Sequence, residues 1–315
     1  MDTEHTEIAI IGGGPAGLTA ALYAARGRAK TTVFERGIPG GQIVTTDRIE
    51  NYPGFPEGLS GAELGDLMTR QAEIHGAIIK GFNPVEAIEA ADGHFTVVSE
   101  EGVFLADAVI LATGTTPRKL GIPGEAELTG RGVSWCATCD GALYRDKEVC
   151  VIGGGDAAVE EAMFLTRFAS QVHLIHRRDA LRATKCLQER AFLNDKIKIH
   201  WNRVVTEVIG ANDKVSAVRL ASTSGEPEEI LPLAGVFIFA GIIPASELVK
   251  NIVELADMGY VNADAYGKTS VPGLFAAGDV ANFGLKQVIT AASKGAQAAF
   301  EALKYLDEGT ATRSK

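Results

Sequence analysis

The sequence predicts an α/β fold with two Rossmann-like dinucleotide-binding domains, and two observations lead to this prediction. Short apolar runs rich in β-branched residues alternate with Ala- and Leu-rich segments, which is the pattern of buried strands followed by helices. A glycine-rich turn follows such a strand twice, beginning at Gly12 and at Gly153. The length of 315 residues suits two domains better than one.

The first glycine-rich turn opens the chain. A strand, a helix and a second strand are expected around it at residues 7–11, 18–25 and 31–34. Gly12 permits the tight turn, Gly14 lets the backbone approach a pyrophosphate, and Gly17 lets helix and strand pack closely. Glu35 ends the second strand, where an acid can bond ribose hydroxyls. A glycine-rich turn in some other α/β domain is the alternative.

The second turn lies in mid-chain. A strand, a helix and a strand are expected around it at residues 148–152, 159–165 and 171–175. Ala158 stands in the third glycine position, where its small side chain still allows close packing. The second strand is followed by a basic cluster, which consists of His176, Arg177, Arg178 and Arg182. Basic side chains at this point pair with the 2′-phosphate of NADP, whereas an acid would repel it. A solvated basic helix start is the alternative, and the preceding fingerprint favours the phosphate site.

The chain contains one CxxC motif, formed by Cys136 and Cys139. This spacing commonly lowers a thiol pKa, and a dithiol is suited to passing electron pairs to another disulfide. Zinc is the alternative, but a structural zinc site takes four ligands, and Cys150 and Cys186 are isolated. Asp140 adjoins the motif, where it can transfer the proton that thiol exchange requires or, alternatively, begin a helix.

Composition narrows the class of partner. The 30 basic and 40 acidic residues give a net charge of −10, which argues against nucleic acid and anionic membranes. No stretch approaches the roughly 20 apolar residues of a membrane-spanning helix. The acidic, polar segment 1–7 does not resemble a secretory signal. We therefore expect a cytoplasmic protein.

Together these motifs resemble the low-molecular-weight thioredoxin reductases along nearly the whole chain. The matching segments are GGGPAG at 12–17, GGQ at 40–42, ENYPGFP at 50–56, CATCDG at 136–141, GGGDAAVEEA at 153–162, HRRDALRA at 176–183 and FAAGDV at 275–280. The resemblance implies an FAD domain split into residues 1–116 and 246–315. An NADPH domain with the CxxC, residues 117–245, is inserted in it. The resemblance also implies a homodimer that reduces thioredoxin or a thioredoxin-like protein.

The resemblance implies roles for individual residues. Cys139 is similar to the thiol that faces the flavin, Cys136 to the thiol that exchanges with the partner, and Asp140 to the proton donor. The residues implied to contact FAD are Gly12, Gly14, Pro15, Ala16, Gly17, Glu35, Gly41, Gln42, Asn51, Thr113, Gly114, Gly278, Asp279, Lys286, Gln287 and Val288. The residues implied to contact NADPH are Gly153, Gly155, Asp156, Ala157, Ala158, His176, Arg177, Arg178 and Arg182.

The chain departs from the family pattern in two places. Lys286 stands where the family often has Arg, which keeps the charge but loses the planar fork. Ala245 follows Pro244 where the family commonly has a Pro-Asn pair, so a local turn contact differs.

Three rival functions fit parts of the pattern. An oxidase that makes disulfides in a small dithiol, and a ferredoxin- or flavodoxin-linked reductase, would not need the arginine cluster. A non-catalytic redox sensor has no reason to keep an intact CATCDG. Because the CxxC and the NADPH motif share one domain and both must meet the flavin, we also expect that domain to rotate at joins 113–117 and 241–244.

Overall fold

The computed structural model describes residues 3–46, 49–91 and 93–313, which divide into two compact units. Unit 1 contains Met1–Thr116 and Ile243–Lys315, and unit 2 contains Pro117–Ile242. The two segments that pass between the units are β7 (Thr115–Pro117) and β16 (Ile242–Pro244), which pair with each other. Within the described residues, no helix is long and apolar enough to cross a membrane.

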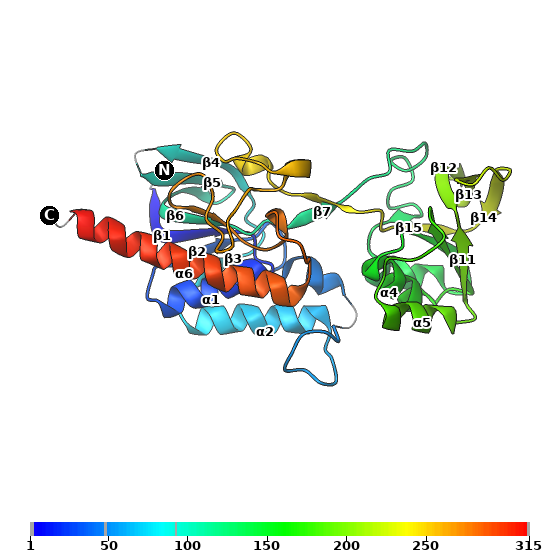
Figure 1. Cartoon of the computed structure of the whole chain (residues 1–315), viewed down its shortest axis with the longest axis horizontal. Coiled ribbons are helices and arrows are strands. Elements are labelled where there is room, and N and C mark those ends of the chain that lie inside the picture. The colour runs from blue at the N-terminus through cyan, green and yellow to red at the C-terminus, as the bar shows by residue number, and fades with distance from the viewer. Residues whose placement is uncertain (1–2, 47–48, 92, 314–315) are drawn as a thin grey trace. The chain divides into compact units, whose positions relative to one another are not determined.

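Unit 1 is built on a mixed sheet. Its strands are β1 (Glu4–Ile11), β2 (Thr31–Phe34), β3 (Ile78–Lys80), β4 (Val85–Ala91), β5 (His94–Ser99), β6 (Gly102–Leu111) and β17 (Leu274–Ala276). Their order is β3-β2-β1-β6-β5-β4, and β17 also pairs with β6 (Figure 1). The pairs among β3, β2, β1, β6 and β17 are parallel, while β4 and β5 add to the sheet in antiparallel fashion.

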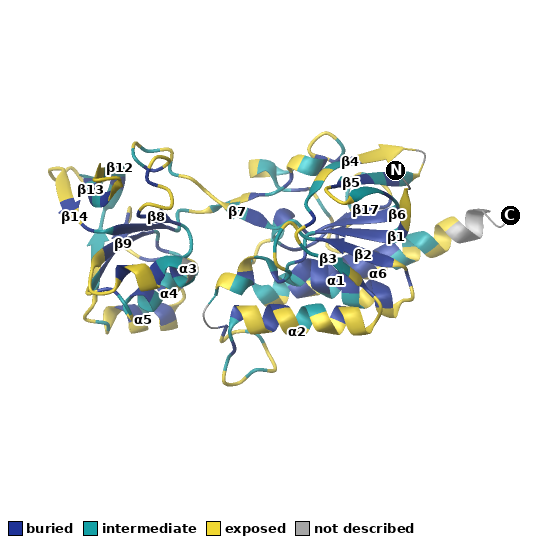
Figure 2. Cartoon of the chain, turned by 180° about the vertical axis from the view of Figure 1, so that it is seen from behind, coloured by how far each residue is buried: buried dark blue, intermediate teal, exposed yellow. Residues whose placement is uncertain are grey.

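Helices cover the parallel part of this sheet. They are α1 (Pro15–Arg26), α2 (Gly61–Ile74) and α6 (Val288–Arg313), with short 3-10 turns η1 (Gly41–Thr45), η3 (Glu247–Val249), η4 (Asp257–Gly259) and η5 (Gly278–Val280). Small side chains such as Ala20 and Ala24 are fully buried in the core that α1 shares with the sheet and α6. Helix α2 begins at the cap Ser60, whose Oγ accepts a hydrogen bond from the N–H of Glu63 at 3.1 Å. Figure 2 shows β2 buried, most of β1 and β6 buried, and much of α2 exposed.

Unit 2 has a parallel sheet between helices and a second, antiparallel sheet. The parallel strands are β8 (Val133–Ser134), β9 (Glu148–Ile152), β10 (Gln171–His176), β11 (Ile197–Trp201) and β15 (Gly235–Ile238), in the order β11-β10-β9-β15-β8. The helical segments are α3 (Ala137–Asp140), η2 (Gly141–Tyr144), α4 (Asp156–Leu165) and α5 (Lys185–Phe192). The antiparallel strands are β12 (Arg203–Ala211), β13 (Lys214–Ser222) and β14 (Glu229–Pro232).

Strand β9 shows how the two faces of this parallel sheet are used. Val149 and Val151 lie in the core shared with α4, whereas Cys150 and Ile152 lie in the core shared with β12, β13 and β14. Because successive side chains of a strand point to opposite faces, a continuous apolar run is required here.

The predicted fold class is confirmed: each glycine motif directly follows a strand, β1 or β9, that pairs in parallel with its neighbours on both sides. Helices α1 and α4 begin at Pro15 and Asp156 rather than at Leu18 and Val159, because the last residues of each glycine motif already form the first helical turn. In the FAAGDV segment at 275–280, the strand β17 ends at Ala276. Gly278, with a φ of 72°, then turns the chain into η5.

Candidate active site

Several loops of unit 1 meet at the first turn of α1, where glycines allow their backbones to touch. A Cβ on Gly41, at the start of η1, would lie 2.8 Å from Cα of Gly14. A Cβ on Gly278 would lie 2.7 Å from Cβ of Ala16. The first part of the chain and its C-terminal part therefore build one site around the start of this helix.

The close approach demanded by the fingerprint is present in both copies. A Cβ on Gly17 would lie 1.8 Å from the carbonyl oxygen of Gly12. Gly12 itself has a φ of 108°, in the left-handed region that favours glycine. In unit 2 the methyl group of Ala158 occupies the third position, and a Cβ on Gly153 would then come within 2.6 Å of it.

Glu35 holds the first glycine loop. Its Oε2 accepts a hydrogen bond from the N–H of Gly13 at 2.7 Å, and its Oε1 accepts one from the N–H of Gly37 at 2.9 Å. A carboxylate has about four lone-pair sites, so these two bonds leave acceptors for ribose hydroxyls.

Side chains from distant segments complete the site. Gln42 donates from Nε2 to the carbonyl oxygen of Thr115 at 2.7 Å and contacts its Oγ1 at 3.1 Å. Asn51 donates from Nδ2 to Oε1 of Gln287 at 2.9 Å. Val288, the first residue of α6, packs against the small core around Ile43. These residues thus tie η1 and the loop after it to the start of α6.

The departure at Ala245 leaves the turn intact, because the turn uses the backbone of this residue. Thr113 donates from Oγ1 to the carbonyl oxygen of Ala245 at 2.7 Å. The N–H of Ala245 donates to the carbonyl oxygen of Gly114 at 3.0 Å. Any non-proline residue at this position can supply these two groups.

Lys286 supports the turn that presents Asp279. Its Nζ donates to the carbonyl oxygens of Asp279 at 2.9 Å and Ala281 at 2.8 Å, and lies 4.4 Å from the ring centroid of Tyr260. Burial raises the pKa of the Asp279 carboxyl, and the Lys286 charge opposes this shift. Burial also disfavours the charged form of Lys286, which lowers the pKa of this amine. Among the described residues, no side chain donates a hydrogen bond to the Asp279 carboxylate, so it is available to a hydroxylated ligand.

These features of unit 1 fit FAD. Helix α1 has Gly14 at its N-cap and no side-chain hydrogen bond there, which leaves backbone N–H groups of its first turn for a pyrophosphate. Glu35 is positioned for a ribose, and the half-buried Asp279 for the ribityl chain.

The second glycine loop is open at its tip. Gly155 is the N-cap of α4 without a side-chain hydrogen bond, and a Cβ built on it would have no heavy atom within 4 Å. Asp156 accepts from the N–H of Thr184 through Oδ1 at 2.6 Å, Ala157 is exposed and Ala158 is buried. The open, uncapped helix start fits the pyrophosphate of NADPH.

The arginines of the basic cluster lie beside this loop. Arg177, Arg178 and Arg182 are exposed, and none of them forms an ion pair within the described part of the chain. The N–H of Arg182 donates to the carbonyl oxygen of Gly154 at 2.7 Å, which ties the cluster to the glycine loop. Three exposed guanidinium groups without carboxylate partners suit a phosphate.

His176 lies differently from the arginines with which the sequence groups it. Only 5% of its surface is exposed. Its Nδ1 lies 3.0 Å from the carbonyl oxygen of Gly153, and its Nε2 lies 3.0 Å from that of Ala180. The imidazole is therefore packed beneath the loops.

The CxxC motif lies at α3 of unit 2. Cys136 is disulfide-bonded, and its N–H donates to Oγ of Ser134 at 3.0 Å. The hydroxyl of Thr138 lies 3.4 Å from Sγ of Cys136. The backbone of Cys139 belongs to α3, while its side chain lies outside the described part of the structure. Ala137 is fully buried in the core that α3 shares with α4.

Asp140 follows directly. Burial raises the pKa of Tyr144, and the negative charge of Asp140 raises it further, so the carboxylate lies near this phenol. Asp140 is the last residue of α3 and the N-cap residue of η2, where its side chain makes no capping hydrogen bond. Its N–H donates to the carbonyl oxygen of Cys136 at 3.2 Å, which keeps the acid beside the dithiol.

The remaining cysteines are free thiols. Cys150 is fully buried, and burial raises the pKa of its thiol far above the ordinary value, which makes it unreactive. Cys186 is exposed near the start of α5. Among the described residues, no group of three or more His, Cys, Asp or Glu side chains is arranged to hold a metal ion.

Sequence reasoning missed residues that position the site from a distance. Gly295 of α6 lies against the start of α1, since a Cβ there would be 2.0 Å from the carbonyl oxygen of Ala16. Thr223 donates from Oγ1 to the carbonyl oxygen of Arg177 at 3.2 Å. A lone glycine inside an otherwise helical segment was the available signal for Gly295. No local pattern marks Thr223.

Comparisons with known proteins show the family of this chain. Residues 6–295 match the pyridine nucleotide-disulphide oxidoreductase family. A thioredoxin reductase of Listeria monocytogenes is 44% identical over 96% of this chain and 94% of its own length. One of Mycolicibacterium smegmatis is 48% identical over 98% of this chain and 99% of its own. The crystal structure of Lactococcus lactis thioredoxin reductase superposes with a TM-score of 0.94 at 42% identity, covering 96% of this chain and 99% of that one.

These matches favour an NADPH-dependent disulfide reductase over the oxidase and over the ferredoxin- or flavodoxin-linked reductase. FAD and NADPH are its cofactors. The chain belongs to the pyridine nucleotide-disulphide oxidoreductase family and, within it, to the thioredoxin reductases, whose motifs run along nearly its whole length.

Proposed function

We propose that this enzyme reduces the disulfide of a thioredoxin or thioredoxin-like protein, with electrons from NADPH that pass through Cys136 and Cys139. The observation that carries the proposal is the place of the CxxC. Helix α3 packs against α4, the helix that begins at the second glycine loop. A disulfide within a CxxC closes too short a loop to add much stability, so redox chemistry explains the motif better than structure does.

The cofactors divide between the units. We assign FAD to the split domain of residues 1–116 and 246–315, whose loops meet at the start of α1. We assign NADPH to the inserted domain of residues 117–245, through the second glycine loop and Arg177, Arg178 and Arg182. FAD, when bound, supplies the conversion of a hydride into an electron pair that a disulfide can accept. The chain's own residues bind, orient and exchange thiols.

In the exchange step, the thiolate of Cys136 attacks one sulfur of the partner disulfide. A new bond from Sγ of Cys136 forms, the partner's bond breaks, and the leaving sulfur takes a proton for which Asp140 is the proposed donor. Cys139 then attacks Sγ of Cys136, which restores the internal disulfide and releases the reduced partner. The Thr138 hydroxyl, 3.4 Å from Sγ of Cys136, is close enough to donate to the thiolate.

Trapping of the partner tests this assignment. In Cys139→Ser the resolving thiol is gone, so a mixed disulfide between Cys136 and the partner should accumulate and show as an adduct by non-reducing mass spectrometry. Cys186→Ser, which removes an exposed free thiol, should form no adduct and keep turnover. Trapping only by Cys136→Ser would reverse the two roles, and trapping by neither variant would reject the dithiol relay.

Rotation of the inserted domain is part of the proposal. The dithiol and the coenzyme loop belong to one unit and the flavin residues to the other, so both must reach the flavin in turn. The paired strands β7 and β16 are the only described segments that pass between the units, and we place the hinge there. A reversible crosslink between the units should stop turnover, and its release should restore it; full turnover in the locked form would exclude the rotation.

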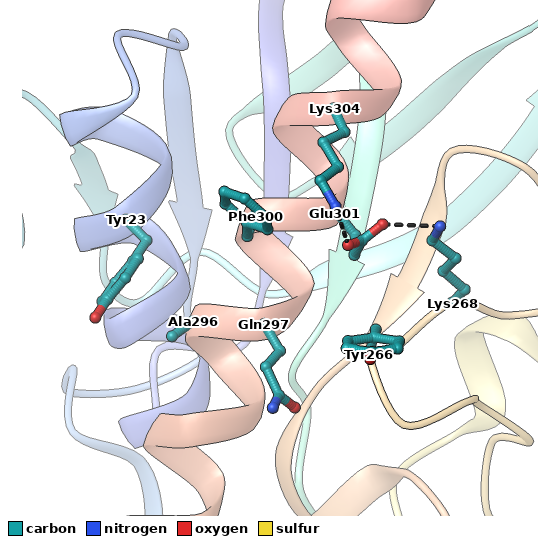
Figure 3. Close-up of a pocket in the computed structure, with 8 residues that line it drawn as sticks. All are labelled: Tyr23, Tyr266, Lys268, Ala296, Gln297, Phe300, Glu301 and Lys304. Atoms are coloured by element: carbon teal, nitrogen blue, oxygen red, sulfur yellow. Dashed lines mark hydrogen bonds and ion pairs between the residues drawn. The ribbon is translucent and has the colours of Figure 1, made fainter.

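We further propose that the chain forms a homodimer through a face of unit 1. Tyr23 of α1, Phe300 of α6 and Tyr266 are 45%, 57% and 57% exposed around a pocket of about 590 Å³ (Figure 3). None of the site residues above lines this pocket. Glu301 forms ion pairs with both neighbouring lysines, Lys268 and Lys304, each at 2.8 Å. Because these charges are paired, the aromatic side chains form the apolar surface of the pocket. Exposed aromatic residues of this kind are typical of interfaces.

Light scattering after gel filtration tests the interface. Tyr23→Ser combined with Phe300→Ser should shift the mass from dimer to monomer, whereas Phe192→Ser, a similarly exposed residue of unit 2, should not. A dimer that survives the double change would place the interface elsewhere.

We also propose a cytoplasmic location, because free thiols and a disulfide that works by exchange belong in a reducing compartment. Cell fractionation checks it.

A further inference from the structure

The imidazole of His176 joins the two loops that form the proposed NADPH site. It ends β10 and is nearly fully buried. Nδ1 faces the carbonyl oxygen of Gly153 in the glycine loop. Nε2 faces the carbonyl oxygen of Ala180 in the loop of residues 177–182, called here the basic loop. Both distances are 3.0 Å. One ring therefore bridges the loop that suits the pyrophosphate and the loop that carries the arginines.

Other contacts make this bridge the centre of a fixed arrangement. The N–H groups of Arg182 and Ala183 donate to the carbonyl oxygen of Gly154, at 2.7 and 3.1 Å. A Cβ on Gly154 would come within 2.3 Å of the His176 ring, so the ring packs directly against the glycine loop. Movement of the imidazole would displace both loops together.

The partners of the ring select its charge state. A carbonyl oxygen only accepts hydrogen bonds, so each ring nitrogen must donate to satisfy this geometry. A neutral imidazole carries one N–H and leaves a lone pair facing the other carbonyl. The imidazolium carries both N–H groups and satisfies both carbonyls.

The surroundings oppose that charge while the coenzyme site is empty of phosphate. Burial lowers the pKa of His176, the hydrogen bonds to Ala180 and Gly153 raise it, and the charges of Arg182 and Arg178 lower it. The neighbour from β11 is the uncharged ring of Trp201, edge-on at 6.3 Å. A phosphate that pairs with the two arginines offsets their charge and so removes one of the causes that keep the ring neutral.

We propose that His176 is a positioning residue for NADPH, which takes up a proton from solvent when the coenzyme binds and then holds the glycine and basic loops together as an imidazolium. The inference rests on the NADPH site proposed above. By linkage, affinity is greatest below the pKa of the coenzyme-free state and is lost as pH rises through the pKa of the bound state. Between these two values, the Kd should rise by up to about tenfold per pH unit.

Calorimetry of the FAD-loaded enzyme with NADP⁺ measures the proton directly. Titrations in two buffers of different ionisation enthalpy give the number of protons taken up. The wild type should take up more protons on binding NADP⁺ than His176→Asn does. Protons that the 2′-phosphate itself exchanges are the same in both proteins, so they cancel when the two numbers are subtracted. His200→Asn, which removes another imidazole of the same unit, should keep the wild-type uptake. Equal uptake by wild type and His176→Asn overturns the inference.

A second measurement needs no variant, and so remains decisive if His176→Asn fails to fold. The NMR titration of the His176 ring in the wild type should show a higher pKa with NADP⁺ than without it. An unchanged or lower pKa contradicts the inference. The outcomes separate the two proposals, because NADP⁺ that binds without protonating His176 rejects only the positioning role. Failure of NADP⁺ to bind at all rejects the coenzyme site.

Discussion

Gly295→Ala tests the packing that builds the flavin site. Gly295 lies within α6, and its missing side chain lets this helix approach the carbonyl oxygen of Ala16 in the first turn of α1. An added Cβ would lie 2.0 Å from that oxygen and 2.9 Å from its carbon, well inside normal contact. Backbone stands on both sides of the contact, so no side chain can swing away, and the two helices must separate.

The expected magnitude follows from two opposing effects. Overpacking costs about 1–3 kcal/mol, and a clash with rigid backbone belongs at the upper end of that range. Alanine regains up to about 1 kcal/mol of helix propensity. The net loss is about 2 kcal/mol of unfolding free energy, or roughly 4–8 °C in Tm for a domain of this size. Because the displaced residue belongs to the proposed pyrophosphate site, FAD affinity should fall as well.

The same helix supplies the control. Gly309 also lies in α6, and a Cβ there would have no atom within 4 Å, so Gly309→Ala should be neutral or slightly stabilising. Thermal unfolding by circular dichroism and reconstitution of the apoprotein with FAD compare the two variants. If Gly295→Ala unfolds at the same temperature as Gly309→Ala and binds FAD equally well, the close contact of α6 with α1 is not present.

Two further predictions concern the acids of unit 1. Glu35→Gln leaves one of the N–H groups of Gly13 and Gly37 without its acceptor, because an amide NH₂ only donates. Urea unfolding should therefore show a loss of about 1–3 kcal/mol of unfolding free energy. The control Glu73→Gln changes an exposed side chain and should leave the unfolding free energy nearly unchanged. In Asp279 the folded-state pKa is raised by burial, so its contribution to stability is present below the unfolded pKa and is lost as pH rises through the folded pKa. Asp279→Asn apoprotein should therefore be more stable than wild type at neutral pH, with the gain shrinking on acidification, and should bind FAD more weakly. A gain in stability that grows toward acid pH would contradict this.

Local patterns predicted the framework of both domains well. The strands at 31–34 and 148–152 have the predicted bounds, because an apolar run between turn signals is decided by neighbouring residues. Contacts over long separations are different in kind. Asn51 meets Gln287 across 236 positions, and nothing near either residue reveals the other.

The direction of the His176 side chain could not be predicted from residue type. The sequence groups it with three arginines because all four can carry positive charge. The structure separates them by direction: the arginines face solvent, while the imidazole faces two carbonyl oxygens inside the unit. Side-chain direction at a strand end depends on the turn that follows, which the pattern of charges does not specify.

Anaerobic reductive titration of the purified flavoenzyme tests the central claim most directly, that a redox-active dithiol works together with the flavin. The flavin absorbance is followed while reductant is added in measured amounts. The wild type should accept one electron pair more per chain than Cys136→Ser before excess reductant appears, because its disulfide takes electrons in addition to the flavin. Equal electron uptake by the two proteins would contradict the account, since Cys136 would then carry no electrons.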